Sequence, residues 1–292
     1  MSDSSDLSER GQNAIPRATI AMADHMVSGD LEREGSRWIS PNGLAASRES
    51  LVGLLDEHGP ADSVKIADLG CGDGRLAVEL AASRPNGEVV AIDVSPRARL
   101  ETQDRLAETA DSRETFATTA AVGGDATRIL DHLEPFDVIY GINFLQDTDD
   151  PVATCRAIRS ALVGDGLAVL TVPGEESIER MESDLFATRA VEVNNDEIEL
   201  PYMTQELAVD GELLEWGQYV FPREQAREFF TGLEFEIVER DCVPVDARGM
   251  TYVARELLDE PELAAEASKI ADCQRADPEV GPVVDAYVLR SE

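Results

Sequence analysis

Short apolar runs alternate with amphipathic stretches through the middle of this chain. The runs have the length of buried strands, and the stretches between them repeat apolar residues at helical spacing. Strand patterns lie at residues 64–69, 88–94, 118–125, 136–144 and 167–173. Helical patterns lie between them, at residues 74–83, 95–109 and 150–164. Apolar strands separated by helices predict a parallel sheet that is covered on both faces.

Two of these helices carry clear start signals. Ser95 and Asp150 can each accept hydrogen bonds from the free N–H groups of a first helical turn, and a proline follows each of them. We expect the second of these helices to end at Gly164, since glycine favours the backbone that closes a helix.

The alternation changes character after Pro173. We expect residues 174–205 to be acidic and irregular, and residues 206–216 to form a hairpin with Asp210 and Gly211 in its tight turn. The later patterns predict a helix at 222–233, a sixth strand at 235–243, a helical stretch from about 250 to 276 and a seventh strand at 283–290. Ahead of the first strand, helical patterns lie at residues 18–28 and 47–58.

The composition indicates a soluble protein of the cytoplasm. Of the 292 residues 43% are hydrophobic, enough for a large core, yet no apolar run reaches the length of a membrane helix. The polar, acidic start lacks the pattern of a signal peptide. The four cysteines are scattered without the spacing of a zinc site, so we expect reduced thiols and no bound metal.

The charge balance is strongly acidic. Acidic residues outnumber basic ones by 59 to 25, which gives a formal net charge of −34, and Lys65 and Lys269 are the only lysines. Such charge repels itself in dilute buffer, whereas salt at about 1 M shortens the Debye length to about 3 Å. The pattern resembles proteins of salt-accumulating halophiles. An ordinary acidic protein that avoids nucleic acid is the alternative.

A turn with little side-chain bulk follows the first strand. Gly70, Gly72 and Gly74 stand between strand and helix, where glycine permits a left-handed backbone and lets a ligand approach free N–H groups. A tight turn without a ligand is the alternative. Asp93 ends the second strand, 19 residues beyond Gly74, where a carboxylate can accept hydrogen bonds from ribose hydroxyls. Asp68 ends the first strand in an apolar context, which is costly for a carboxylate without a donor or a cation.

The glycine spacing distinguishes between candidate nucleotides. Dinucleotide-binding folds use GxGxxG, whereas here the third glycine comes one residue early. A carboxylate beside the turn also disfavours a pyrophosphate. A cofactor that carries a cation and a ribose but no phosphate fits better, and S-adenosylmethionine is such a molecule.

The segments "VKIADLGCGDGR" and "VVAIDVS" resemble the first two motifs of class I S-adenosylmethionine-dependent methyltransferases. Three later segments are similar to further motifs of that family, namely "GGDATRI", "FDVIYGINFLQDTDDP" and "ALVGDGLAVLTVP". The resemblance covers roughly residues 45–240. It implies an α/β, Rossmann-like fold with a seven-stranded sheet of order 3-2-1-4-5-7-6, in which only the last strand is antiparallel and helices cover both faces.

The resemblance also implies a set of cofactor-binding residues near the carboxyl ends of the strands. The set comprises Asp68, Gly70, Cys71 and Gly72 for the methionine part, Asp93 for the ribose, Val94, Asp125 and Ala126 for the adenine, and Asn143 beside the methionine and the sulfonium. Cys71 is expected to fill space in the turn rather than to act as a nucleophile.

Several absences bear on the methyl acceptor. The fourth strand ends in "GINF", without the Asn/Asp-Pro-Pro-aromatic motif used on amino groups of bases, and no Pro-Cys nucleophile is present. There is no basic patch interleaved with aromatic residues. The net charge would also repel phosphates, although less so in a saline cell. Nucleic acid is therefore a disfavoured substrate.

Residues 199–241 are similar to the acceptor-covering segment of methyltransferases that act on small molecules, a branch that includes ubiquinone/menaquinone C-methyltransferases. The candidate wall of the acceptor site comprises Tyr202, Met203, Trp216, Tyr219 and Phe221. The alternative is that these residues only build the hydrophobic face of the hairpin.

Candidate bases are few. Asp147 follows the fourth strand at the expected catalytic edge, although a solvated loop is the alternative for this residue. His25 lies in the N-terminal helix that covers the cofactor in this family. His58 and His132 are expected away from the site, and Asp150 is expected to cap a helix.

The sequence thus predicts a methyltransferase that uses S-adenosylmethionine on a small organic acceptor, as a monomer or homodimer. Alternatives are a tRNA or protein methyltransferase, a non-catalytic S-adenosylmethionine-binding protein and, less favoured, a nicotinamide-dependent oxidoreductase. The expected divisions are an N-terminal helical cap at 1–45, the cofactor-binding core at 46–173, an acceptor-covering segment at 174–222, and a completion of the sheet at 223–292.

Overall fold

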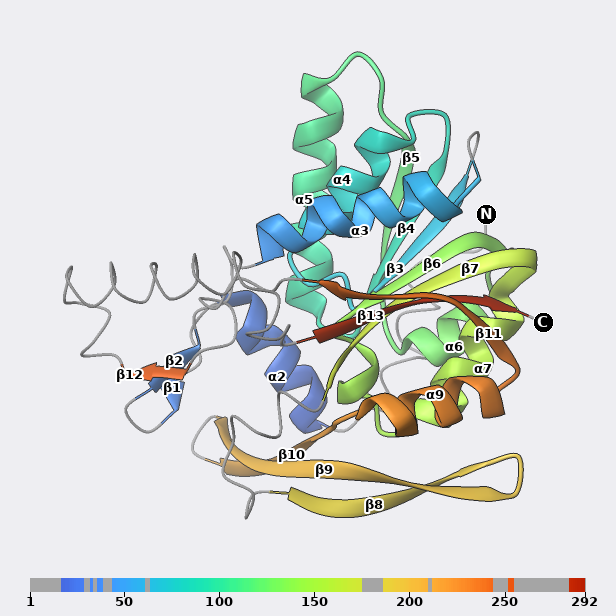
Figure 1. The fold of residues 1–292 in the computed structure, drawn as a ribbon. Coiled ribbons are helices and arrows are strands. Elements are labelled where there is room, and N and C mark those ends of the chain that lie inside the picture. Colours follow the sequence, from blue (N-terminus) through green and yellow to red (C-terminus); the bar gives the residue numbers. More distant parts are fainter. Residues whose placement is uncertain are drawn as a thin grey trace.

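A seven-stranded sheet runs through the described part of the chain (Figure 1). The computed structural model describes residues 17–28, 32–33, 36–38, 44–60, 64–174, 186–209, 212–243, 252–254 and 284–291. In sheet order the strands are β11 (Phe235–Val243), β13 (Val284–Ser291), β7 (Leu162–Pro173), β6 (Phe136–Ile142), β3 (Lys65–Leu69), β4 (Glu88–Asp93) and β5 (Thr118–Gly123). Only β13 runs antiparallel to its neighbours. The predicted order 3-2-1-4-5-7-6 is therefore confirmed.

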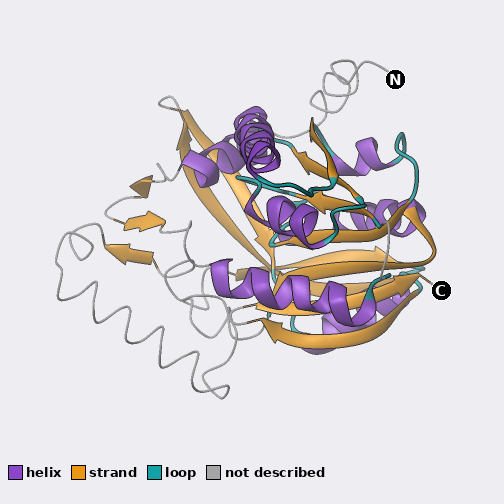
Figure 2. Ribbon diagram, turned by 90° about the horizontal axis from the view of Figure 1, so that it is seen from above, coloured by secondary structure: helices purple, strands orange, loops and turns teal. Residues whose placement is uncertain are grey.

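Helices cover both faces of this sheet (Figure 2). One face carries α3 (Leu44–His58), α4 (Arg75–Ser83) and α5 (Pro96–Ser112), and the other carries α6 (Ala126–Leu130), α7 (Pro151–Ala161) and α9 (Arg223–Gly232). Ile66 and Ala67 are neighbours in β3 and are both fully buried, yet they belong to opposite cores. Burial on both faces is why the strand sequences show apolar runs instead of alternation.

The predicted helix starts are confirmed, and one predicted end is wrong. The Ser95 hydroxyl accepts from the Ala98 N–H at 2.9 Å, and the Asp150 carboxylate accepts from the Ala153 N–H at 2.9 Å. The helix after β6 ends at Ala161 and not at Gly164, because Leu162 is extended, buried and already paired with β6.

A second, antiparallel sheet follows β7 in the chain. Its strands are β8 (Phe186–Val193), β9 (Asp196–Val209) and β10 (Glu212–Tyr219), in the order β10-β9-β8. Val209 pairs with Glu212, which confirms the predicted hairpin, while its turn at Asp210 and Gly211 lies outside the described residues. This sheet lies on the side of α9 away from the main sheet (Figure 1).

The prediction of an irregular segment was wrong from residue 186 onward. Val191 and Ile198 face the core while their neighbours Glu192 and Glu197 are exposed, so the segment has the two-residue period of a strand. Acidic residues at the exposed positions concealed this period. Asn194 and Asn195 both have positive φ, 52° and 73°, which suits a two-residue hairpin turn.

Two smaller features complete the described chain. The helix α2 (Arg17–Ser28) contacts α5 and the β9–β10 hairpin. The strands β1 (Glu32–Arg33), β2 (Ser36–Trp38) and β12 (Tyr252–Ala254) form a third sheet. The helix predicted from about 250 to 276 is wrong at β12, because that segment pairs with β2, and the rest of it lies outside the described residues. None of the described helices is long and apolar enough to cross a membrane.

A buried ion pair ties the antiparallel edge of the main sheet together. The Asp285 side chain on β13 is fully buried, and Arg240 on β11 donates to its Oδ1 at 2.7 Å. Arg223, the first residue of α9, lies 4.0 Å from Oδ2. A buried carboxylate is tolerated here because two guanidinium groups compensate it.

Replacing Asp285 with Ala should lower the free energy of unfolding by about 3 kcal/mol, because the loss of one partner from a buried pair leaves the other charge uncompensated. Urea denaturation at constant salt measures this. The matched control is Glu236→Ala, which removes an exposed pair with Arg290 (3.3 Å) and should cost less than about 1 kcal/mol. Equal losses of unfolding free energy in the two variants would contradict a stabilising role of the buried Asp285 ion pair.

Candidate functional site

The glycine turn folds over the end of β4. Gly70, Gly72 and Gly74 all have positive φ, at 66°, 53° and 76°. The N–H groups of Gly70 and Cys71 both donate to the carbonyl oxygen of Ile92, at 2.8 and 3.2 Å. Side chains with a Cβ adopt the left-handed region only at a cost, so this path requires glycines.

The three glycines serve different purposes. A Cβ on Gly70 would lie 2.9 Å from the Phe144 ring, and a Cβ on Gly74 would lie 2.7 Å from the Thr102 hydroxyl. A Cβ on Gly72 would meet no atom of the described residues within 4 Å. Two of the glycines therefore allow close packing, while Gly72 leaves open space over the backbone into which a ligand can fit.

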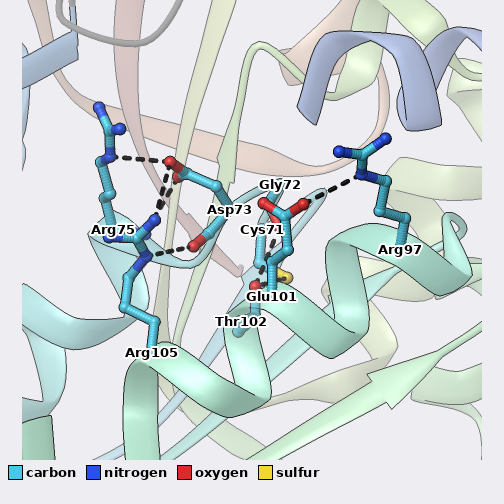
Figure 3. Close-up of polar contacts among 8 residues, drawn as sticks. All are labelled: Cys71, Gly72, Asp73, Arg75, Arg97, Glu101, Thr102 and Arg105. Carbon is cyan, nitrogen blue, oxygen red and sulfur yellow. Dashed lines mark hydrogen bonds and ion pairs between the residues drawn. The ribbon is translucent and has the colours of Figure 1, made fainter. Parts of the chain in front are cut away.

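Helix α5 holds the turn from the other side (Figure 3). The Thr102 hydroxyl donates to the Gly72 carbonyl at 2.9 Å and lies 3.5 Å from the Cys71 sulfur. Arg105 Nε donates to the Asp73 carbonyl at 2.7 Å. Sequence reasoning did not identify Thr102 or Arg105, because nothing in a helix sequence shows which loop lies against it.

The Asp73 carboxylate is engaged within the turn. It pairs with Arg75 at 2.7 Å and with Arg105 at 3.5 Å (Figure 3). These contacts compensate its charge by local cations, which distinguishes Asp73 from the two carboxylates that end the neighbouring strands.

Asp68 is a buried carboxylate near the end of β3, and the residue is 2% exposed. No residue in the described part of the chain forms a hydrogen bond with its Oδ2. Burial raises its pKa to about 8, and the negative charge of Asp93 adds to the rise, while the Ala77 backbone N–H acts in the opposite direction. A carboxyl group placed in this way suits a cationic group of a ligand.

Asp93 ends β4 and reaches across to the glycine turn. Its Oδ2 accepts from the Gly72 N–H at 2.9 Å, and its Oδ1 accepts from the Ser95 N–H at 2.8 Å. Burial raises its pKa to about 6 in spite of these hydrogen bonds. The Ser95 hydroxyl donates to Asp24 of α2, so the N-terminal helix contacts this edge of the sheet.

The loop between β5 and α6 lies beside Asp93. The Gly124 N–H donates to the Asp93 carbonyl at 2.8 Å, and Asp125 then caps α6 by accepting from the Thr127 N–H at 2.9 Å. Ala126 is buried at the start of that helix, and Val94 is partly exposed after β4. The residues expected around the adenine thus follow β4 and β5, next to Asp93.

Asn143 follows β6 in a left-handed conformation, with φ of 49°. Its N–H donates to the Thr171 hydroxyl at 2.8 Å, and that hydroxyl donates to Asn143 Oδ1 at 3.2 Å. Thr171 on β7 therefore fixes the Asn143 side chain. The next residue, Phe144, places its ring against Gly70, which joins this loop to the glycine turn.

Asp147 lies at the end of a short 3₁₀ helix, η1 (Leu145–Asp147). Its Oδ1 accepts from Gln218 Nε2 of β10 at 2.8 Å. Burial raises the pKa of Asp147 to about 7, and the hydrogen bond from Gln218 acts in the opposite direction. The side chain is therefore bound to the second sheet rather than to solvent in a free loop. Sequence reasoning did not identify Gln218.

The structure describes the side chains of two of the three histidines. His58 ends α3 and contacts the Glu239 carboxylate on β11, and His132 is exposed beyond α6. His25 belongs to α2, but its side chain lies outside what the structure describes. Asp150 is a helix cap, as expected.

The aromatic residues of the hairpin lie mainly in the core. Phe221 is fully buried with its ring centroid 5.4 Å from that of Phe229, and Tyr219 is 5% exposed. Tyr202 is partly exposed, and the Arg189 guanidinium lies 3.6 Å from its ring centroid. This burial fits the alternative of a hydrophobic hairpin face, most clearly at Phe221. Met203 is also buried, and the Trp216 side chain lies outside the described part.

Two glycine-to-alanine variants should distinguish a glycine that is needed for close packing from one that leaves room for a ligand. Gly72→Ala and Gly74→Ala both place a Cβ in left-handed backbone, at about 1–2 kcal/mol. Gly74→Ala also presses on Thr102, including its Cα at 2.9 Å, so we expect it to lose about 1–3 kcal/mol more. Urea denaturation of both variants measures the difference. A Gly72 variant as unstable as the Gly74 variant would show that the space over Gly72 is filled.

The raised pKa of Asp68 predicts a pH-dependent stability of the ligand-free protein. Between the ordinary value of about 3.9 in the unfolded chain and about 8 in the folded chain, only the folded chain keeps the proton. This contribution to stability therefore falls as the pH rises from about 4 to 8. Asp68→Asn removes this contribution. The free energy of unfolding of the variant, relative to that of the wild type, should therefore be higher at pH 8 than at pH 5. A difference that does not change with pH would contradict a buried, unpaired Asp68.

Comparison with known proteins yields one family match and many similar folds. Residues 67–168, about a third of the chain, match the family model described as "Methyltransferase domain". This range begins just before the glycine turn and ends in β7. No curated protein matches the sequence.

Three solved structures illustrate the shared fold. The CcbJ methyltransferase from Streptomyces caelestis is 15% identical with a TM-score of 0.57, covering 94% of this chain and 98% of its own. Magnesium protoporphyrin IX methyltransferase (ChlM) from Synechocystis PCC 6803, with bound SAH, is 12% identical with a TM-score of 0.54, covering 99% of both chains. The [4+2]-cyclase SpnF is 17% identical with a TM-score of 0.50, covering 94% and 92%. The chain thus has the Rossmann-like fold of these proteins and carries a segment that matches the methyltransferase domain.

Proposed function

We propose that this chain is an S-adenosylmethionine-dependent methyltransferase that transfers a methyl group to a small organic acceptor. The observation that carries the proposal is the buried carboxyl of Asp68, whose Oδ2 has no hydrogen-bond partner among the described residues, together with the open space over Gly72. The match of residues 67–168 to the methyltransferase domain supports it.

The residues present fit this cofactor group by group. Asp68 supplies a negative charge for a cationic cofactor, and Gly72 leaves room beside the turn. Asp93 supplies two carboxylate oxygens at the end of β4 for ribose hydroxyls. Asp125 and Ala126 follow Gly124, whose N–H donates to the Asp93 carbonyl, and we expect them to contact the adenine edge with Val94 against its face.

A nicotinamide dinucleotide fits the same residues less well. Asp68 and Asp93 lie close enough for the charge of Asp93 to raise the pKa of Asp68. A pyrophosphate at this turn would add two further negative charges to that pair. The oxidoreductase alternative is therefore the weaker one.

The bound cofactor supplies an electrophilic methyl group on a sulfonium. The chain's own residues then have a positioning task, because the reacting atoms must be held about 3 Å apart and in line. Asp93 would hold the ribose and Asp68 the cationic part of the cofactor, and Asn143, whose side chain is oriented by Thr171, would lie beside the sulfonium.

A small acceptor is favoured over a macromolecule. The formal net charge of −34 disfavours phosphate-rich partners, and the β8–β10 sheet contacts η1 and α2 near this edge. The resemblance to the ubiquinone/menaquinone C-methyltransferase branch supports the same class. One protein with this fold is a [4+2]-cyclase, so the fold alone does not identify the reaction. The proposal therefore has to be tested through cofactor binding.

Cofactor binding is the decisive measurement. Calorimetric titration with S-adenosylmethionine and SAH, at about 0.1 M and about 2 M KCl, should show binding that is strongest in high salt, because salt screens the self-repulsion of the acidic chain. Asp93→Ala and Gly72→Ala should each weaken it at least tenfold, because one loses the ribose acceptor and the other fills the ligand's space. Glu101→Ala, on the exposed pair with Arg97, is the control.

The nicotinamide alternative gives a different result in the same titration. Binding of NAD or NADP alone would overturn the proposal. Failure of a folded protein to bind any of the four ligands in either salt would overturn it as well.

A further inference from the structure

We propose that Glu57, His58 and Glu239 bind a divalent transition-metal ion of the zinc type, which fastens the edge strand β11 to helix α3. This inference goes beyond the proposed function and does not depend on it.

The three side chains offer donor atoms that suit such an ion. His58 supplies an imidazole nitrogen and each glutamate supplies a carboxylate oxygen, and these atoms all lie within 4.8 Å of one another. Zinc binds such nitrogen and oxygen atoms at about 2.0–2.2 Å, so the donors around one ion are about 3–4 Å apart. Small side-chain rotations would therefore bring all three atoms to one ion, with water as the fourth ligand of a tetrahedral site.

A β-bulge brings Glu239 to the face of the sheet that α3 covers. Ile237 packs against the core on the α9 side, and Val238 packs against the core on the α3 side. Strict alternation would return Glu239 to the α9 side. Instead Ile237 and Glu239 pair with successive residues of β13, which leaves Val238 as the extra residue. Bulges re-aim side chains in this way, and here Glu239 contacts Nε2 of His58.

Negative charge gathers where α3 ends. Glu57 and His58 are the last two residues of this helix, and the carbonyl groups of a helix end carry a partial negative charge. Among the described residues no arginine or lysine pairs with Glu57 or Glu239. Arg84, which follows α4, lies 2.7 Å from the Asp56 carboxylate instead. A divalent cation would compensate both glutamates and the helix end together.

The cluster lies away from the proposed cofactor site. The helix α4 begins at the glycine turn, and Arg84 follows its last residue. Arg84 donates to the Leu55 carbonyl at 3.3 Å and pairs with Asp56, the residue before Glu57. The end of α3 therefore lies beside the end of α4 that is farthest from the glycine turn. Metal binding at this place can be measured without the methyl donor.

No local motif in the sequence indicates this site. The expectation of no bound metal rested on the spacing of the cysteines, which are not part of the cluster. His58 and Glu239 are 181 residues apart, and the fold alone brings them together. Because β11 is the edge strand of the main sheet, an ion held by all three residues would join that edge to a helix, and its binding free energy would add to stability.

Metal titration of the full chain tests the site. Protein treated with EDTA is titrated calorimetrically with zinc nitrate, in about 1 M potassium nitrate to screen the acidic chain. The wild type should bind one zinc ion per chain. His58→Ala and Glu239→Gln should each weaken this binding by at least about 100-fold, because loss of even an outer-shell partner costs about 10–100-fold. His132→Ala, at an exposed histidine outside the cluster, is the matched control and should bind as the wild type does.

Two further measurements separate this site from other sources of zinc binding. X-ray absorption of the zinc-loaded wild type should show nitrogen and oxygen neighbours at about 2.0–2.2 Å and no sulfur neighbour at about 2.3 Å. Zinc should also raise the melting temperature of the wild type but not that of Glu239→Gln, which keeps the size of the side chain.

Three outcomes would overturn the proposal. They are the absence of one-to-one zinc binding in the folded wild type, binding that persists in both variants of the cluster, and a sulfur neighbour, which would place the ion at a cysteine. Each of them would leave His58 and Glu239 as an ion pair without a metal.

Discussion

The site depends on two hydrogen bonds to one carbonyl oxygen. The N–H groups of Gly70 and Cys71 both reach Ile92 at the end of β4, so the turn after β3 must fold sharply over the neighbouring strand. That path is left-handed at Gly70, Gly72 and Gly74. It brings the Gly72 N–H to the Asp93 carboxylate and leaves the space above Gly72 open. The contacts from α5 then hold the turn in this path.

This edge of the sheet carries negative charge with few compensating groups. Burial raises the pKa of Asp68 and of Asp93, and each lacks an arginine of the kind that pairs with Asp73 or Asp285 among the described ion pairs. A fold selected for stability alone would remove or pair such carboxyl groups. Their retention is understandable if a cationic ligand compensates them, since binding sites often sacrifice stability for function.

Aromatic contacts join the second sheet to the main sheet. A continuous row of aromatic contacts with centroid distances between 4.8 and 6.4 Å runs through Tyr202, Tyr219, Phe221, Phe229, Phe230 and Tyr287. The row begins on the β9–β10 hairpin and ends on β13 of the main sheet. Gln218 precedes Tyr219, so its distance to Asp147 is set by this packing. Three residues of the predicted acceptor wall, Tyr202, Tyr219 and Phe221, take part in this row.

The sequence by itself determined what depends on local periodicity and local hydrogen bonds. Apolar runs defined the strands of the main sheet, Ser95 and Asp150 marked helix starts, and the resemblance carried by the glycine turn and Asp93 supplied the strand order. The β8–β9 hairpin was missed, although Asn194 and Asn195 stand between two alternating segments, because acidic residues at the exposed positions obscured the two-residue period.

Only the tertiary structure decided what depends on residues far apart in the chain. Three sets of contacts join segments separated by tens to hundreds of residues. They are the hydrogen bonds from Thr102 and Arg105 to the glycine turn, the hydrogen bond between Gln218 and Asp147, and the pairing of the strand at Tyr252 with β2. The end of α7 at Ala161 was likewise set by pairing of Leu162 with β6. Local preference cannot specify such contacts, because their free energy comes from burial and hydrogen bonds that exist only once the sheet has formed.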